Sequence, residues 1–297
     1  MNNEQLNKKQ ILFIVNPISG LGKQKRIEKW IDEGLDKSKF ISNIVHTTHA
    51  GHATELSRKA IEDGADIIVA VGGDGTVNEI GQTLIGSSTV LGIIPTGSGN
   101  GLARHLKIPF SFEKAINIIN LGNVRKIDTA TVNDKVFLSV AGIGFDAFVA
   151  RKFSLAAKRG FITYFRIVSG EYPKYTPEVY DLEIDGKMIT RRALLVTFAN
   201  SNQFGNNTSI DPMAIIDDGY IDVCIVRRIP LLLTPFYVPL LFTGTFHKTQ
   251  YIEIIKAKEV RIVRREGNTV HFDGDPDNMG KTLDIKINPL SLNIIVP

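Results

Sequence analysis

Short apolar runs alternate with helix-spaced apolar residues along the first third of the chain. The runs are nearly unbroken, as in strands that are buried on both faces of a parallel sheet. The expected strands cover residues 11–15, 41–46, 66–71 and 90–95, and the expected helices cover residues 23–35, 53–63 and 76–84. This β-α-β repetition predicts a doubly wound parallel sheet, in which ligands bind at the carboxyl ends of the strands.

Beyond about residue 125 the pattern changes to short alternating or apolar runs, separated by turn pairs such as Asp185-Gly186. The runs cover residues 136–140, 179–184, 193–199, 220–226, 259–263, 269–272 and 283–287. Such a pattern is typical of an antiparallel β-sandwich, here interrupted by one expected helix at 153–168. We therefore predict an α/β N-terminal domain with a parallel sheet, residues 1–128, and a C-terminal antiparallel β-sandwich domain, residues 129–288.

Length and charge narrow the class of protein further. A chain of 297 residues favours two domains. Lys and Arg number 35 against 31 Asp and Glu, which gives a net charge of +4 without a long basic run. This balance argues against a nucleic-acid partner, which would need a concentrated basic face. It suits anionic small molecules or a weak contact with an anionic membrane.

Three features bear on the compartment. The single cysteine, Cys224, excludes an intramolecular disulfide and indicates a reducing environment. Residues 1–10 are polar and contain no apolar signal core, so we expect no export. The uncharged stretch 229–246 is interrupted by prolines, and we interpret it as a helical or looping apolar segment rather than a membrane span. We expect a cytoplasmic protein.

Three glycine-rich turns follow apolar strands of the first domain, at residues 16–20, 72–79 and 95–101. Turns at the carboxyl ends of successive parallel strands are expected to converge. Glycine lets backbone N–H groups approach phosphate oxygens, and a following helix N-terminus favours negative charge. Asp74, between two glycines, is a candidate for holding Mg²⁺ beside phosphate. Neither a Walker A pattern nor a GxGxxG fingerprint stands in the expected place, so we predict a phosphate site of another design.

His46, His49 and His52 are spaced three residues apart, which is a pattern that zinc sites also use. No cysteine completes the set, and Glu55 is the only carboxylate close in sequence. We interpret the segment as a solvated or nucleotide-adjacent loop rather than a zinc site.

Six motifs follow one another along the chain: Asn16-Pro17-x-Ser19-Gly20, Gly72-Gly73-Asp74-Gly75-Thr76-x-Asn78-Glu79, Pro95-x-Gly97-Ser98-x-Asn100, Gly142-x-Gly144-Phe145-Asp146, Asp217-Asp218-Gly219-Tyr220-Ile221-Asp222 and Asp273-Gly274-Asp275-Pro276. In this order they make nearly the whole chain resemble the diacylglycerol kinase catalytic-domain family. Within it the chain is most similar to the YegS-like bacterial lipid kinases, which are related to sphingosine and ceramide kinases. The resemblance implies that residues 289–297 return to the first domain.

The resemblance also implies roles for individual residues. It assigns ATP binding to Asn16, Pro17, Ile18, Ser19, Gly20, Thr47, Gly72, Gly73, Asp74, Gly75, Thr76, Val77, Asn78 and Ser98. It implies a structural Mg²⁺ held by Asp218 together with backbone oxygens near Ile215 and Tyr220.

The catalytic side chains that the resemblance implies are carboxylates. Asp275 stands where the family usually has the glutamate that acts as general base, and Asp273 is its rival. Asp74 would serve the phosphate and metal side of the reaction. Gly101 stands where many bacterial diacylglycerol kinases carry Asp, which leaves the acceptor open between diacylglycerol and a sphingoid base.

A lipid acceptor must be reached from a bilayer, which requires apolar side chains at the surface. Phe161, Tyr164, Phe165 and Val168 share one expected helix face, and residues 231–242 are strongly apolar. Either set is ordinary core or forms an acyl-chain groove and a peripheral membrane contact. Two rival functions remain, a kinase of the NAD kinase type and a catalytically silent lipid- or nucleotide-binding protein. Homodimer formation is left open.

Overall fold

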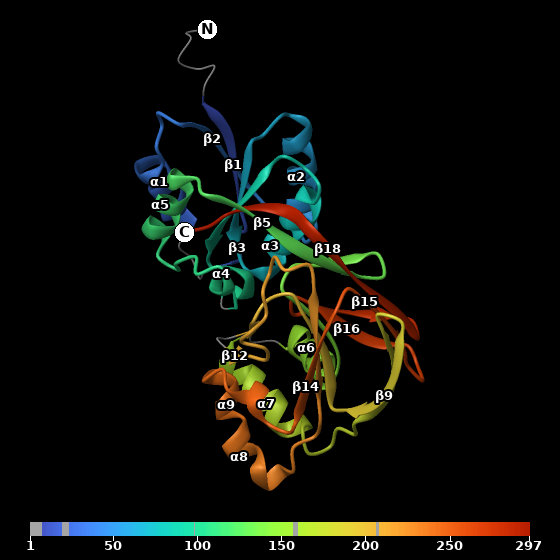
Figure 1. Ribbon diagram of the computed structural model, residues 1–297. Helices are drawn as coiled ribbons and strands as arrows, with labels where there is room; N and C mark the ends of the chain where they lie inside the picture. The colour runs from blue at the N-terminus through green and yellow to red at the C-terminus, as the bar shows by residue number, and fades with distance from the viewer. Residues whose placement is uncertain (1–7, 20–23, 98, 157–159, 206–207) are drawn as a thin grey trace. The chain divides into compact units, whose positions relative to one another are not determined.

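The computed structural model describes residues 8–19, 24–97, 99–156, 160–205 and 208–297 (Figure 1). The chain forms two compact units, Met1–Ile127 with Leu290–Pro297, and Asp128–Pro289. Both passages of the chain between the units lie within strands, β5 (Val124–Val132) and β18 (Thr282–Ile295). Among the described helices, none combines the length and the apolar character that crossing a bilayer requires.

The first unit is an α/β layer structure built on a parallel sheet. Its strands are β1 (Lys9–Val15), β2 (Phe40–His46), β3 (Ile67–Gly72) and β4 (Val90–Pro95), in the spatial order β2-β1-β3-β4. All three pairings are parallel, and Ile294 of β18 pairs in parallel with Leu91 of β4. The strands β1, β3 and β4 are the ones predicted from unbroken apolar runs. β3 and β4 are almost completely buried, and β1 is buried from Ile11 onward except for half-buried Leu12.

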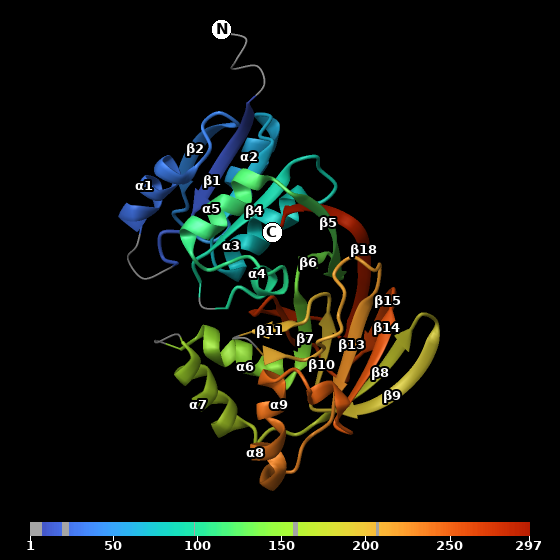
Figure 2. The same cartoon turned by 60° about the vertical axis from the view of Figure 1, so that its left-hand side comes forward.

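Helices cover both faces of this sheet (Figures 1 and 2). They are α1 (Gln24–Gly34), α2 (His52–Glu62), α3 (Asp74–Leu84), α4 (Gly101–His105) and α5 (Phe112–Leu121). On one face, Ile31 of α1 and Ile116 of α5 share a core with Phe13 of β1 and Val69 of β3. The predicted helices α1, α2 and α3 are confirmed, whereas α4 and α5 were not expected from the sequence.

The second unit is a sandwich of two antiparallel sheets, as predicted. One sheet has the order β14-β13-β10-β7-β16-β17, with β7 (Val140–Gly144), β10 (Leu195–Ala199), β13 (Ile221–Val226), β14 (Ile252–Ala257), β16 (Asn268–Phe272) and β17 (Asp275–Met279). The first part of β18 continues the other sheet through β15 (Glu259–Val263), β8 (Glu178–Ile184) and β9 (Lys187–Ala193), and β5 pairs with both β18 and β6 (Lys135–Phe137). A short separate hairpin joins β11 (Gln203–Gly205) and β12 (Thr208–Ser209).

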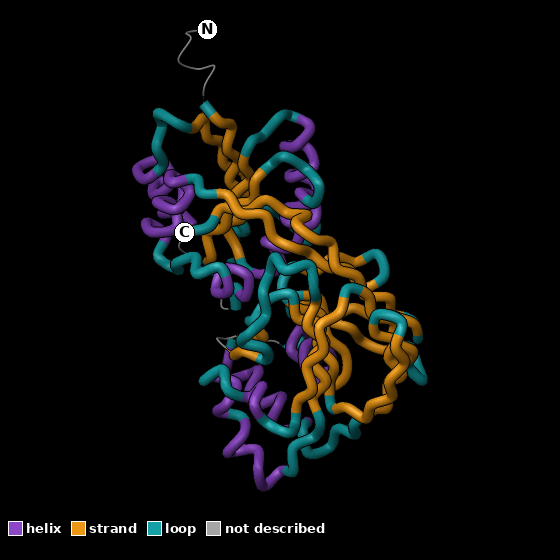
Figure 3. Tube along the Cα trace, in the orientation of Figure 1, coloured by secondary structure: helices purple, strands orange, loops and turns teal. Residues whose placement is uncertain are grey.

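The sandwich core lies between its two sheets, where Val196 and Val223 of the first sheet pack in one cluster with Leu182 and Leu283 of the second. Helices gather on the outer face of the first sheet, where Phe145 and Val149 join Cys224 in another cluster (Figure 3). They are α6 (Phe145–Ser154), α7 (Phe161–Glu171), the 3-10 turns Leu231–Leu233 and Phe246–Lys248, and the short helices α8 (Thr234–Tyr237) and α9 (Pro239–Phe242). The last four confirm that the uncharged stretch is helical and looping.

Two predicted elements of this unit were wrong in detail. The single helix expected at 153–168 is two helices, α6 and α7, because Gly160 before α7 has φ 126°, a conformation through which a helix cannot continue. The strand expected at 136–140 is divided between β6 and β7 at Leu138 and Ser139. The backbone N–H groups of these two residues bond to a side chain instead of a neighbouring strand.

Candidate functional site

The three glycine turns of the first unit contact one another at the carboxyl ends of β1, β3 and β4. Asn16 Nδ2 after β1 donates a hydrogen bond of 3.0 Å to Thr76 Oγ1 in α3. The hydroxyls of Ser19 and Thr96 lie 2.8 Å apart, and Thr96 N donates to Gly72 O at 2.9 Å. Side-chain and backbone bonds therefore tie the three turns into one cluster at the sheet edge where parallel folds bind ligands.

Glycine is required in this cluster because backbones touch there. A Cβ on Gly97 would lie 2.7 Å from Gly73 Cα, closer than real Cβ contacts come. A Cβ on Gly72 would lie 2.5 Å from the Thr76 side chain. The three turns thus form a cradle that is lined by backbone atoms. Helix α3 begins beside this cradle, with Gly73 as its N-cap residue. The first turn of a helix presents N–H groups and a partial positive charge, which is a fit for phosphate oxygens.

Asp74 holds the third turn in place. Its Oδ2 accepts a hydrogen bond of 2.7 Å from Asn100 N, and its Oδ1 accepts one of 2.7 Å from Gly101 N. Asn100 is buried with φ 52°, and its Nδ2 donates to Gly97 O. The carboxylate therefore caps the start of α4 and ties it to the start of α3. A carboxylate oxygen has more than one lone pair, so these bonds are compatible with the predicted role of Asp74 toward Mg²⁺.

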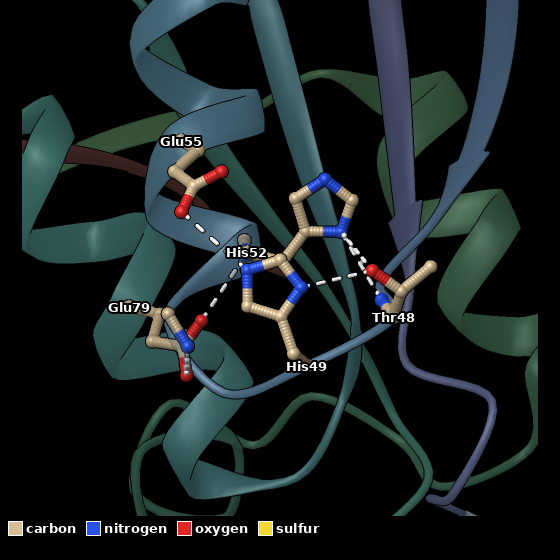
Figure 4. Close-up of polar contacts among 7 residues, drawn as sticks. Thr48, His49, His52, Glu55 and Glu79 are labelled. Atoms are coloured by element: carbon tan, nitrogen blue, oxygen red, sulfur yellow. Dashed lines mark hydrogen bonds and ion pairs between the residues drawn. The ribbon is translucent and has the colours of Figure 1, made fainter.

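Glu79, five residues after Asp74 in the sequence, caps the N-terminus of another helix. Its carboxylate oxygens accept the N–H groups of Gly51 and Ala53 at 3.0 and 3.1 Å, at the N-terminus of α2 (Figure 4). Thr54 Oγ1 also donates to Glu79 O. The two acidic residues of the Gly72–Glu79 motif thus each bind backbone amides that lie tens of residues away in sequence. The sequence predicted the motif but not these caps.

The histidine segment lies beside the Glu79 cap. The rings of His49 and His52 stack with centroids 4.7 Å apart, and both Nδ1 atoms lie within 3.1 Å of Thr48 Oγ1 (Figure 4). His46 pairs instead with Glu28 at 3.6 Å. Within the described part of the chain, no three His, Cys, Asp or Glu side chains are grouped so that they could hold a metal ion. The structure therefore separates His46 from the other two.

The remaining predicted nucleotide residues follow the turns. Thr47 is buried, and its N–H bonds to Val15 O at the end of β1. Ile18 N bonds to Asn16 Oδ1 while the Ile18 side chain is 91% exposed. Pro17, Gly75 and Asn78 are half-buried and Val77 is buried. Gly20 and Ser98 lie outside the described residues. Thr96, which the resemblance did not assign, is the additional hydroxyl that the structure places in the cluster.

In the second unit, the two candidate bases have different surroundings. Asp273 has φ 51° and begins the turn between β16 and β17. Its Oδ1 accepts the N–H groups of Ser139 and Val140 at 2.8 and 2.9 Å, and its Oδ2 accepts that of Leu138 at 2.9 Å. Asp275, the first residue of β17, is exposed. Asp273 therefore builds the turn that presents Asp275.

A buried polar cluster lies between the first sandwich sheet and α6. Asp146 Oδ2 accepts hydrogen bonds from Thr197 Oγ1 at 3.0 Å and faces His271 Nε2 at 3.1 Å. A Cβ on Gly142 would collide with both Asp146 and His271, which explains why the Gly142-x-Gly144-Phe145-Asp146 motif begins with glycine. Burial and, secondarily, the charge of Asp146 raise the pKa of Tyr164 to about 12. The sequence located Asp146 but not its partner His271.

The predicted metal residues lie on the turn before β13. Asp218 Oδ1 accepts Tyr220 N at 3.1 Å, and Asp218 Oδ2 lies 2.8 Å from Lys256 Nζ. Ile215 and Tyr220 are exposed. Buried Asp128, which is not one of the predicted metal residues, supports the turn by accepting Gly219 N at 2.7 Å. Both oxygens of Asp218 thus have hydrogen-bond donors of this chain.

Charge and burial shift the pKa values of the ionisable groups around this turn. Burial, followed by the charge of Asp211, raises the pKa of Asp222 to about 6 even though Lys256 acts in the opposite sense. Burial alone would lower the pKa of Lys256, but its hydrogen bond with Asp218 and the charge of Asp222 outweigh burial and raise it. Lys256 is therefore held as a cation among carboxylates.

Comparison with known proteins places this architecture in a family. Residues 10–132 match the diacylglycerol kinase catalytic domain, and residues 139–296 match the YegS C-terminal NAD kinase beta sandwich-like domain. The chain therefore belongs to the diacylglycerol kinase catalytic-domain family and carries the C-terminal domain of YegS-like proteins. As a member of this family the protein is a kinase.

Individual relatives cover almost the whole chain. A diacylglycerol kinase of Bacillus subtilis (strain 168) is 28% identical over 278 residues, which are 91% of this chain and 91% of the relative. A protein of Enterobacter sp. (strain 638) named "Probable lipid kinase YegS-like" is 30% identical over 268 residues, 86% of this chain and 87% of the relative. The crystal structure of a diacylglycerol kinase from Bacillus anthracis str. Sterne has a TM-score of 0.77 at 23% identity and covers 97% of both chains, which shows the shared fold.

Proposed function

We propose that the protein is an ATP-dependent lipid kinase that transfers the γ-phosphoryl group to a lipid hydroxyl, with diacylglycerol as the first candidate acceptor. The cluster of three backbone-lined turns at the ends of β1, β3 and β4 is the observation that carries the proposal. The names of the relatives, diacylglycerol kinase and YegS-like lipid kinase, support the lipid acceptor.

The turns of the first unit would bind the nucleotide. The amides at the start of α3 and the hydroxyls of Ser19, Thr76 and Thr96 are suited to phosphate oxygens. Asp74 would hold Mg²⁺, which when bound neutralises charge on the phosphates. Asp74 also holds the start of α4 in position through its bonds to Asn100 and Gly101. Binding and orientation are therefore the tasks of this unit.

Asp275 would act as the general base. The acceptor oxygen forms a bond to the γ-phosphorus, the bond from that phosphorus to the bridging oxygen of ADP breaks, and the hydroxyl proton passes to the Asp275 carboxylate. An exposed carboxylate suits this task better than one that accepts three amides, as Asp273 does. Asp273 then serves as a positioning residue for the turn.

The second unit also offers an apolar surface for the lipid side of the reaction. Leu232 is 87% exposed on the turn before α8, and Phe236 within α8 is 71% exposed. Figures 1 and 2 both show α7, α8 and α9 gathered at one end of this unit. Exposed leucine and phenylalanine side chains on short helices can enter the interface of a bilayer. We propose peripheral membrane contact through these residues.

Replacing Leu232 and Phe236 together by Glu is expected to weaken binding to lipid vesicles by about 100-fold or more, because each inserted apolar side chain contributes on the order of 1.5–3 kcal/mol. Activity on vesicle-bound acceptor should fall in parallel, whereas activity on a short-chain soluble acceptor should not. Cosedimentation with vesicles measures the binding. Met188→Glu, at an exposed apolar residue of β9, is the matched control. Equal vesicle binding by the double variant and the control would reject this surface.

The acceptor is tested with a panel. Purified protein receives ATP and Mg²⁺ with diacylglycerol, a sphingoid base or NAD, the lipids being presented in mixed micelles. The expected result is phosphate in diacylglycerol or, as the second candidate that Gly101 favours, in the sphingoid base. Phosphate in NAD alone would reject the lipid kinase, and ATP binding without transfer to any acceptor would indicate a silent binding protein.

A further inference from the structure

Lys256 joins two acidic residues of the Asp217–Asp222 motif. In the antiparallel pairing of β13 with β14, Asp222 lies directly opposite Lys256. Lys256 Nζ is 2.8 Å from Asp218 Oδ2 and 3.3 Å from Asp222 Oδ1. Asp222 is only 2% exposed, so its carboxylate is almost entirely removed from water. The ammonium therefore bridges a turn carboxylate and a buried strand carboxylate.

The surroundings of Lys256 require a cation. Asp211 is buried as well and interacts electrostatically with Asp222. Buried carboxylates are stable only when opposite charge or hydrogen bonds compensate their lost hydration. Within the described residues, Lys256 is the only cation that forms an ion pair with Asp218 or Asp222. The Lys256 ammonium is thus the counter-charge of Asp218 and Asp222, and it offsets part of the effect of burial on Asp222.

The arrangement does not fit a divalent ion on the same turn. Mg²⁺ requires oxygen ligands in near-octahedral geometry at about 2.0–2.1 Å. An ion bound to the Asp218 carboxylate would lie next to the Lys256 ammonium, and like charges at such a separation repel each other. The Asp218 site therefore already has its cation.

We propose that the Lys256 ammonium replaces a structural divalent cation at the Ile215–Asp222 turn, so that this chain folds there without a metal. The proposal is independent of the acceptor and of the nucleotide site. It assigns Asp218 and Asp222 to an internal ion pair that anchors the turn to β14. Removal of the ammonium should expose a latent divalent-cation site formed by the two carboxylates and neighbouring backbone oxygens.

The first test uses the wild-type chain and Asp218→Asn, both without nucleotide. Bound Mn²⁺ is counted by electron paramagnetic resonance, and thermal unfolding is followed in EDTA and in excess Mg²⁺ at constant ionic strength. We expect both proteins to bind the same number of Mn²⁺ ions. The wild-type unfolding midpoint should shift by less than about 1 °C on changing from EDTA to Mg²⁺. One additional Mn²⁺ per wild-type chain, lost in Asp218→Asn, would overturn the proposal.

The second test removes the ammonium. Lys256→Met should unfold at a lower temperature than the wild type in EDTA and should gain about 3 °C or more with Mg²⁺. Adding Asp218→Asn to this variant should abolish the gain. Lys258→Met is the matched control. Lys258 is two residues from Lys256 in the sequence, and its ammonium lies over the Tyr220 ring. The unfolding temperature of this control should not rise with Mg²⁺. A Lys256→Met variant that responds to Mg²⁺ no more than the control would contradict the proposal.

Discussion

Replacing Asp275 by Asn is expected to reduce phosphoryl transfer to the lipid by about 100- to 10 000-fold, the usual contribution of general base catalysis. An amide cannot accept the hydroxyl proton, while its size is nearly that of the carboxylate. Because Asp275 is exposed, the variant should fold normally. ATP affinity, measured by calorimetry, should be unchanged, since the turns proposed to bind ATP lie in the other unit.

The same substitution at two neighbouring aspartates should have different effects. Asp273→Asn should instead destabilise the protein by about 2–4 kcal/mol, because an amide group cannot accept the three N–H groups that the carboxylate accepts. Asp277→Asn removes only an exposed ion pair with Lys135 and should change stability by less than about 1 kcal/mol and activity little. If Asp275→Asn retained wild-type turnover while Asp273→Asn folded and lost it, the assignment of the base would be reversed.

Gly97→Ala is expected to weaken ATP binding by about tenfold or more and to lower the free energy of unfolding by about 2 kcal/mol. The added Cβ would lie 2.7 Å from Gly73 Cα, and neither backbone can move without separating the turns after β3 and β4. Gly97 has no positive φ, so the expected cost is steric and not conformational. Calorimetric titration with ATP and denaturant unfolding measure the two effects.

Gly170→Ala is the matched control for this steric argument. Gly170 lies in α7 without a positive φ, and a Cβ there would meet nothing within 4 Å. Alanine favours helix over glycine, so this variant should be as stable as the wild type or slightly more so. If Gly97→Ala bound ATP as tightly as Gly170→Ala does, the backbone contact of Gly73 and Gly97 would not be part of the nucleotide site.

The sequence was most informative where a local pattern determines the structure. The unbroken apolar runs of β1, β3 and β4 are typical of strands buried in a parallel sheet, and each of these strands ends in a turn that the glycines mark. The contact between Asn16 and Thr76 could be anticipated because parallel strands end at one sheet edge. The sandwich followed from short strands separated by turn pairs.

Long-range polar partners could not be predicted in the same way. Asp74 and Glu79 bind amides at the starts of α4 and α2, and the positions of these helix ends depend on the whole fold. His271 and Asp146 are 125 residues apart, and nothing in the local sequence pairs them. The same applies to Lys256, whose partner on the Gly219 turn is fixed only by the pairing of β13 with β14. The sequence indicated which side chains could form polar contacts, but not which residues they would contact.

The two units have different proposed roles, so substitutions in each unit should have different effects. In the first unit, glycines and carboxylates shape a backbone cradle, so substitutions there should affect nucleotide binding and stability together. In the second unit, Asp273 and Lys256 stabilise turns, whereas Asp275 and the exposed apolar side chains near α8 are candidates for contact with the acceptor. Substitutions of the latter group should affect transfer without affecting ATP affinity.

The most direct test of a lipid kinase follows the phosphate itself. Wild-type protein is incubated with Mg²⁺ and with ATP labelled at either the γ- or the α-phosphate, in mixed micelles that contain diacylglycerol and a sphingoid base, and the lipid is extracted. We expect label in the lipid fraction from γ-labelled ATP alone, and its loss with Asp275→Asn. Absence of label from both lipids, although ATP binds and the protein is folded, would contradict the proposed function.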